Sequence, residues 1–157
     1  MQPRSKLVGL YWLAMQCFGP FAGLLLRYRQ NRGKEDPDRF DERKGIAGIA
    51  RPAGPLVWMH GASVGEALAL LPLAALIRGR GVQVLFTTGT VTSARLMSER
   101  LPAGIIHQYL PLDVPRFWQR FLLHWRPGMV IIAESELWPN MLAQTHAAHI
   151  PAIIVNG

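Results

Sequence analysis

The stretch Pro55-Leu-Val-Trp-Met-His-Gly-Ala-Ser-Val-Gly-Glu66 predicts the first unit of the fold. Its residues 56–59 are apolar, with a β-branched and an aromatic side chain, as is typical of a buried strand. The small residues that follow allow a tight turn, and Ser63 suits the N-cap of an apolar helix from Val64 onward. Strand, glycine-bearing turn and helix open an α/β sheet, in which chemistry is placed where strands end and helices begin. Glu66 is therefore the leading candidate for a catalytic residue.

The composition indicates a folded chain with a basic N-terminal part. With 157 residues, 50% of them hydrophobic and 17% charged, the chain can bury the core of one domain and is not a disordered protein. Its net charge of +7 suits nucleic acid, a membrane or an anionic substrate. The basic residues gather beside the most apolar segment, without interleaved stacking aromatics, which favours a membrane over nucleic acid. A single cysteine, Cys17, excludes an internal disulfide and a cysteine-based structural zinc site, and is compatible with a reducing compartment.

Residues 7–26 contain no charged side chain and are flanked on both sides by basic residues. About 20 apolar residues is the length of a helix that spans a bilayer. Gln16, Gly19 and Pro20 leave open a kinked or interfacial helix, and a buried core helix is a further alternative. The segment lacks the small-residue cleavage pattern of a signal peptide. We therefore expect residues 1–27 to form a membrane-anchor helix.

Residues 28–54 are expected to be a charged connector followed by a linker. The first part, up to Lys44, has mixed charge and contains Pro37, so it is too polar for a core. We interpret it as a solvated connector whose arginines could contact lipid headgroups or an anionic substrate. Residues 45–54 are mostly small and lead flexibly into the domain.

Residues 55–157 alternate strand and helix patterns, which predicts an α/β, Rossmann-like, doubly wound parallel sheet. The predicted strands and helices are, in order, 56–59, 64–77, 82–87, 91–100, 105–110, 114–124, 129–133, 138–148 and 152–155. Such a domain normally continues with a helix after its fifth strand. We therefore expect a partly uncovered sheet edge and a longer parent protein.

A doubly wound sheet that begins in its middle reverses direction between its first and fourth strands, and the turns after them form a crevice. These turns are residues 60–66 and 134–140, and both are acidic. Paired carboxylates suit general acid–base chemistry on a hydroxyl, and a helix N-terminus favours an ionised carboxylate. Glu66 and Glu134 are the predicted pair, although a glutamate at a helix start also satisfies free amides. Glu136 could equally cap the next helix.

Other polar residues at the same edge are weaker candidates. Thr87 and Thr88 could bind a sugar or phosphate, but hydroxyl-rich turns are more often caps. His60 suits a ligand contact or a structural role equally, and Asp113 is expected to cap the third helix of the domain. No metal-ligand spacing, G-x-G-x-x-G motif or P-loop occurs in the sequence, so no metal is expected.

A second interpretation is a membrane-anchored serine hydrolase. Gly61-Ala-Ser-Val-Gly65 fits the G-x-S-x-G nucleophile elbow, and Ser63 would be followed by an acid, Glu134, and a histidine, His146 or His149. An elbow normally follows earlier strands, one of which lends an oxyanion-hole amide, whereas only anchor and linker precede this one. Both histidines also fall on or just after a predicted helix. A binding remnant without activity is a third possibility.

Four ordered motifs resemble those of the 3-deoxy-D-manno-octulosonic acid (Kdo) transferases. They are His60-Gly-Ala-Ser-Val-Gly-Glu66, Thr87-Thr-Gly-Thr-Val-Thr92, Tyr109-Leu-Pro-Leu-Asp113 and Glu134-Ser-Glu-Leu-Trp-Pro-Asn140. The resemblance implies the N-terminal half of a two-domain GT-B glycosyltransferase. Such enzymes transfer Kdo from CMP-Kdo to a lipid A precursor (lipid IVA) at the cytoplasmic face of the bacterial inner membrane. It also implies that Glu66 is the catalytic base and that Glu134 is required.

The resemblance extends to the acceptor site and the partners. It implies acceptor contacts at the two acidic turns and the end of the second strand: His60, Ser63, Gly65, Thr87, Thr88, Glu136, Trp138 and Asn140. The implied donor is CMP-Kdo, with no cofactor and no bound metal, and attack inverts the anomeric centre. The domain that binds CMP-Kdo in this family is absent from these residues. We therefore expect this chain alone to bind the acceptor at best.

Overall fold

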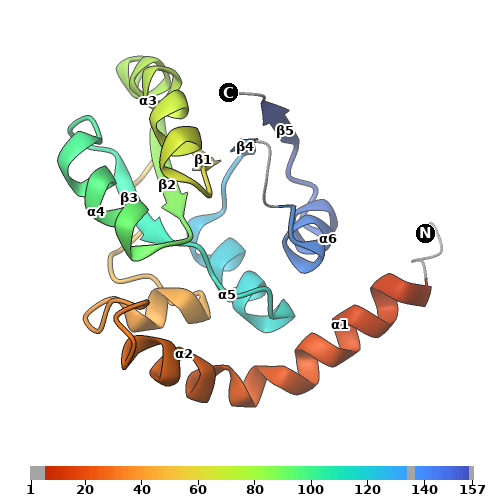
Figure 1. Ribbon diagram of the computed structural model, residues 1–157. Coiled ribbons are helices and arrows are strands. Elements are labelled where there is room, and N and C mark those ends of the chain that lie inside the picture. Colours follow the sequence, from red (N-terminus) through yellow and green to blue (C-terminus); the bar gives the residue numbers. More distant parts are fainter. Residues whose placement is uncertain (1–5, 134–136, 156–157) are drawn as a thin grey trace.

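A parallel sheet lies at the centre of the computed structural model, which describes residues 6–133 and 137–155 (Figure 1). Within these residues the strand order is β3-β2-β1-β4-β5. The bounds are β1 (Leu56–His60), β2 (Gln83–Thr88), β3 (Ile106–Tyr109), β4 (Met129–Ala133) and β5 (Ala152–Val155). Since β2 and β3 lie on one side of β1 and the later strands on the other, the order reverses between β1 and β4. The predicted doubly wound sheet and its switch point are confirmed.

Four helices connect these strands within a residue or two of their predicted bounds, the usual uncertainty of helix ends. They are α3 (Val64–Gly79), α4 (Val91–Arg100), α5 (Pro115–Trp125) and α6 (Pro139–Ala147). The edge strand β5 is partly uncovered, as expected, because Ile153 and Ile154 are 45% and 53% exposed.

The alternation of side chains along β1 divides the core between the two faces of the sheet. Trp58 belongs to the cluster on the face of α5 and α6, and its ring lies 5.6 Å from that of Trp118 and 4.8 Å from that of Phe121, measured between centroids. Met59 belongs to the opposite cluster, with Ala67 of α3. Helices on both faces explain why the strands read as continuous apolar runs.

Glycine is required at position 61, in the turn after β1. A Cβ atom there would lie 2.8 Å from the backbone nitrogen and Cα of Ala67. The first turn of α3 therefore approaches the end of β1 more closely than any side chain would allow, and this fixes where the amino end of α3 stands.

The apolar N-terminal segment forms a curved helical arm, residues 6–30, which runs alongside the domain (Figure 1). The arm consists of α1 (Lys6–Phe18), the 3-10 turn η1 (Gly19–Phe21) and α2 (Ala22–Gln30). Its inner face packs on the domain, where Ala22 is buried against Val114 and Phe117. The predicted helix is present in its described part, with a 3-10 turn where Gly19 and Pro20 suggested a kink.

The opposite face of the arm is an exposed apolar stripe. Its members recur every three or four residues, or after two turns, and are between 53% and 77% exposed: Leu7, Leu10, Leu13, Phe21, Leu24 and Tyr28. The arm is therefore apolar on two faces, one covered by the domain and one uncovered.

The prediction of a solvated connector is wrong for three of its charged residues, while Pro37, Asp38 and Asp41 are exposed as expected. Glu35, Glu42 and Arg43 are 91–95% buried. Glu42 lies in the 3-10 turn η2 (Phe40–Lys44), and its Oε2 accepts a hydrogen bond from the backbone nitrogen of Tyr109 at 2.8 Å. The physical reason is the exposed edge of β3, whose outward N–H and C=O groups need partners. Charged side chains of the connector supply them.

Asp113 caps a different helix from the predicted one. The N-cap of α5 is Val114, which makes no side-chain capping bond. The two carboxylate oxygens of Asp113 instead accept hydrogen bonds from the backbone nitrogens of Asn140 and Met141, at 3.1 and 3.0 Å, in the first turn of α6. They also accept from Trp118 Nε1 and from the hydroxyl of Tyr11, both at 2.8 Å. One buried carboxylate thus joins the arm, α5 and α6.

We expect Asp113→Ala to lower the free energy of unfolding by at least about 3 kcal/mol, because each buried donor left without a partner costs about 1–3 kcal/mol. Urea unfolding followed by circular dichroism measures this. The matched control is Asp41→Ala, which removes an exposed carboxylate bonded to Lys44 and should cost less than about 1 kcal/mol. Equal losses in the two variants would contradict the role assigned to Asp113.

Candidate active site

The carboxyl ends of β1 and β4 lie side by side, as the topology requires. His60, the last residue of β1, is in register with Ile132 of β4 on one side and Thr87 of β2 on the other. The two acidic turns therefore start from adjacent strands. Glu134 and Glu136 lie outside the described residues, so their predicted meeting with Glu66 stays a prediction.

Glu66 lies in the first turn of α3 and is held in a variant of the capping box, in which its carboxylate bonds the amide of the residue before the N-cap. Its Oε2 accepts a hydrogen bond from the backbone nitrogen of Ala62, and its Oε1 accepts one from the hydroxyl of Ser63, both at 3.0 Å. Ser63 is the N-cap, as predicted, and its hydroxyl accepts from the backbone nitrogen of Glu66 at 3.2 Å. The carboxylate is half-buried, and these two hydrogen bonds orient it.

The serine hydrolase interpretation is not supported by the contacts of Ser63. Its hydroxyl donates to Glu66, and among the described residues no histidine contacts it. His146 and His149 are exposed at the far, carboxyl end of α6, and His60 points its Nδ1 at Thr87. A serine nucleophile needs a histidine base within hydrogen-bond reach.

Four predicted acceptor contacts are buried inside the domain: His60, Thr87, Thr88 and Asn140. His60 Nδ1 lies 3.0 Å from the carbonyl oxygen of Thr87, to which it donates. The side chain of Asn140 donates to the carbonyl oxygen of Asp113 at 2.7 Å. These four act in this structure as supports of the edge, whereas Ser63, Gly65 and Trp138 are exposed at it.

A cavity of about 360 Å³ lies between the arm and the carboxyl edge of the sheet. Its lining comes from the arm, from Arg43 of η2, from Gly89 and Thr90 after β2, from the segment between β3 and α5, and from Trp138 beside α6. Thr90 is also the N-cap of α4 and accepts from the backbone nitrogen of Ser93 at 3.1 Å.

Comparison with known proteins identifies the family. The model of the 3-deoxy-D-manno-octulosonic-acid transferase (kdotransferase) family matches residues 38–157. A probable mitochondrial 3-deoxy-D-manno-octulosonic acid transferase of Arabidopsis thaliana is 38% identical over 139 residues, covering 87% of this chain and 31% of that protein. The 3-deoxy-D-manno-octulosonic acid transferase of Rickettsia bellii is 35% identical, covering 94% of this chain and 35% of that one. The 3-deoxy-D-manno-octulosonic acid transferase of Haemophilus influenzae is 36% identical, covering 87% of this chain and 32% of that protein.

The chain belongs to the Kdo transferase family. It spans about a third of the length of these curated relatives. The family match begins at Asp38, so it includes η2 and the whole sheet, while the arm precedes it.

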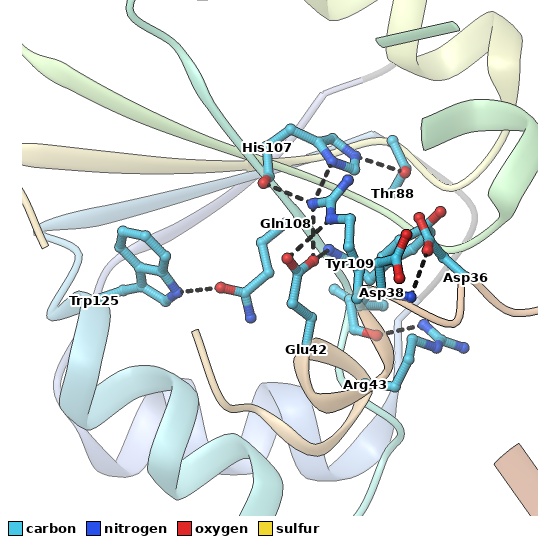
Figure 2. Close-up of polar contacts among 11 residues, drawn as sticks. Asp36, Asp38, Glu42, Arg43, Thr88, His107, Gln108, Tyr109 and Trp125 are labelled. Carbon is cyan, nitrogen blue, oxygen red and sulfur yellow. Dashed lines mark hydrogen bonds and ion pairs between the residues drawn. The ribbon is translucent and has the colours of Figure 1, made fainter. Parts of the chain in front are cut away.

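Sequence reasoning missed the ionic cluster that joins the connector of this family domain to β3 (Figure 2). Arg39 donates to both carboxylate oxygens of Glu42, at 2.9 and 2.8 Å, and its Nη2 also lies 2.9 Å from the carbonyl oxygen and from Nδ1 of His107. His107 Nε2 lies 2.9 Å from the hydroxyl of Thr88. The spacing of three residues between Arg39 and Glu42 was a signal of an ion pair in the sequence. Nothing in the sequence indicated their distant partners on β3.

The same contacts explain the state of His107. Because arginine can only donate, Nδ1 must accept, and Nε2 carries the proton that it donates to Thr88. A second proton would face the Arg39 guanidinium. Burial and this nearby positive charge lower the pKa of His107 to about 3.

We therefore expect acid to destabilise the domain through His107. Between pH 6 and pH 4 the unfolded chain binds a proton at this histidine that the folded domain does not. The free energy of unfolding should then fall by up to about 1.4 kcal/mol per pH unit as pH decreases. We expect urea unfolding at pH 6, 5 and 4 to show this decrease in the free energy of unfolding in the wild type and in His146→Gln. The decrease should be smaller by the contribution of this histidine in His107→Gln. Identical slopes in all three proteins would refute this assignment.

Proposed function

We propose that this chain is the acceptor-side domain of a glycosyltransferase that transfers Kdo from CMP-Kdo to a lipid A precursor, with Glu66 as the base. The proposal rests on the family membership and on the oriented carboxylate of Glu66 at the carboxyl end of β1. In an α/β sheet this is the position at which ligands bind.

The proposed step is a single displacement. A sugar hydroxyl of the acceptor gives its proton to the Glu66 carboxylate, and its oxygen forms a bond to the anomeric carbon of Kdo. The bond from that carbon to the phosphate oxygen of CMP breaks on the opposite face, and CMP leaves with the electron pair. The anomeric centre is inverted. Ser63 and the amide of Ala62 hold the carboxylate in place, so it does not need to reorganise during the reaction.

We further propose that the arm lies in the plane of a bacterial inner membrane, on its cytoplasmic side. By length and composition Lys6–Gln30 could cross a bilayer. However, its inner face packs on the domain, and Tyr11 is bonded to Asp113. A helix that crossed the bilayer would have to give up these contacts. An in-plane arm keeps them and buries its exposed apolar stripe in lipid.

Replacement of Glu66 by Gln tests the chemical proposal in a full-length enzyme that contains this domain. We expect the rate of Kdo transfer to fall by about 10²–10⁴-fold, since the amide oxygen of Gln can still accept from the backbone of Ala62 but the amide cannot take a proton. The control is Glu99→Gln, a change of an exposed glutamate in the last turn of α4, which should leave the rate unchanged. Near-normal transfer by a folded E66Q enzyme would sink the proposal.

A second experiment tests the placement of the arm. Leu10→Glu combined with Leu24→Glu puts charge into the exposed stripe, where the two leucines are 66% and 64% exposed. We expect sedimentation with phosphatidylethanolamine–phosphatidylglycerol vesicles to fall at least tenfold, with an unchanged melting temperature. Leu76→Glu on α3 changes a leucine that is 54% exposed outside the arm, and it should bind vesicles like the wild type. Equal vesicle binding by all the proteins would exclude an in-plane anchor.

A further inference from the structure

The cavity under the arm is mainly apolar and is continuous with the membrane-facing side of the arm. Met15, Phe18 and Leu25 form its arm side. Leu25 lines the cavity, is 39% exposed and directly follows Leu24 of the exposed stripe, so the cavity borders the face that we place in lipid. The volume of about 360 Å³ falls within the range of small-molecule sites, about 300–1,000 Å³.

The same cavity has a cationic lining residue with donors to offer. Arg29 donates through Nε to Glu35 at 2.6 Å, and its side chain is 35% exposed. In the part of the chain that the structure describes, no contact occupies its two terminal amino groups. A guanidinium fork presented in this way suits a phosphate group.

The cavity also reaches the catalytic edge. Thr90 follows β2 and Trp138 precedes α6, and both line it. A ligand in the cavity would therefore contact lipid-facing residues on one side and neighbours of the switch point on the other.

We propose that this cavity receives an acyl chain of the lipid acceptor, with the phosphate of that acceptor bound by Arg29. The inference rests on the proposed function for the identity of the acceptor. The apolar arm side of the cavity suits an acyl chain, the Arg29 guanidinium suits a phosphate, and the carboxyl edge of the sheet suits a sugar. The lipid acceptor is one molecule that has all three parts. A bulk phospholipid could occupy the apolar part of the cavity and contact Arg29, but it has no sugar to place at the carboxyl edge of the sheet.

The test is a binding assay with this chain, using phosphatidylcholine nanodiscs with and without a tetraacylated glucosamine disaccharide bisphosphate. Met15→Trp and Leu25→Trp each fill the cavity from the arm. Because each excluded methylene weakens binding by about fourfold, we expect the affinity for acceptor nanodiscs to fall at least tenfold. Affinity for acceptor-free nanodiscs should stay within twofold of the wild type. Leu25→Trp, at a more exposed position, decides the matter if Met15→Trp does not fold.

Matched controls lie on the same arm. Leu13→Trp adds the same ring to a residue that is 53% exposed and outside the cavity lining, and it should bind acceptor nanodiscs like the wild type. Arg29→Gln should weaken acceptor binding at least fivefold, whereas Arg32→Gln, which removes a guanidinium stacked on Tyr28, should not. The disaccharide bisphosphate without acyl chains should bind the wild type and Met15→Trp equally.

Two results would overturn the inference. Folded tryptophan variants that bind acceptor nanodiscs as the wild type does would show that the cavity holds no acyl chain. Equal losses on acceptor-free nanodiscs would assign the cavity to bulk phospholipid instead. The proposed function fails separately, if a full-length enzyme binds the acceptor but transfers no Kdo to it.

Discussion

The carboxylate of Asp113 accepts hydrogen bonds from the arm, from α5 and from the amino end of α6, and the placement of these elements depends on it. It is 94% buried, and its donors come from positions far apart in the chain. Two of them are free backbone amides of the first turn of α6, where a negative charge is favoured. Because these two amides belong to the first turn of α6, this one group sets where α6 begins. Because Tyr11 is among the donors, it sets where the arm lies as well.

The other constraint on the site comes from the edge of the sheet. As the outermost strand, β3 has backbone groups with no neighbouring strand to bond them. The connector covers them with Glu42, which accepts from the backbone of Tyr109, and Arg39, which donates to the backbone of His107. The charges that suggested a solvated segment are thus part of the folded domain. This agrees with the start of the family match at Asp38, just before η2.

These two sets of contacts place the apolar arm against a sheet whose carboxyl edge carries Glu66. In the function proposed above, an acceptor embedded in lipid would present its sugar to that edge without leaving the bilayer. The capping box restrains the carboxylate through Ser63 and Ala62, close to the turn where only glycine fits at position 61. Lipid contact, cavity and base would thereby lie along one path from the bilayer to the switch point.

The sequence by itself determined the features that depend on neighbours in the chain. The apolar run 56–59 and the alternation of strand and helix patterns after it predicted the sheet and the edge on which the site lies. Ser63 before an apolar helix predicted the N-cap. Only the tertiary structure decided the long-range contacts: Tyr11 with Asp113 across 102 residues, Glu42 with Tyr109 across 67, and Asp113 with α6 instead of α5. The physical reason is that strands and helices are indicated by local patterns of apolar residues, with periods of two and 3.6 residues. The partner of a buried charge depends on which unsatisfied backbone groups the packed elements bring within hydrogen-bond distance of it. Such groups lie far apart in the chain, so no local sequence pattern predicts the pairing.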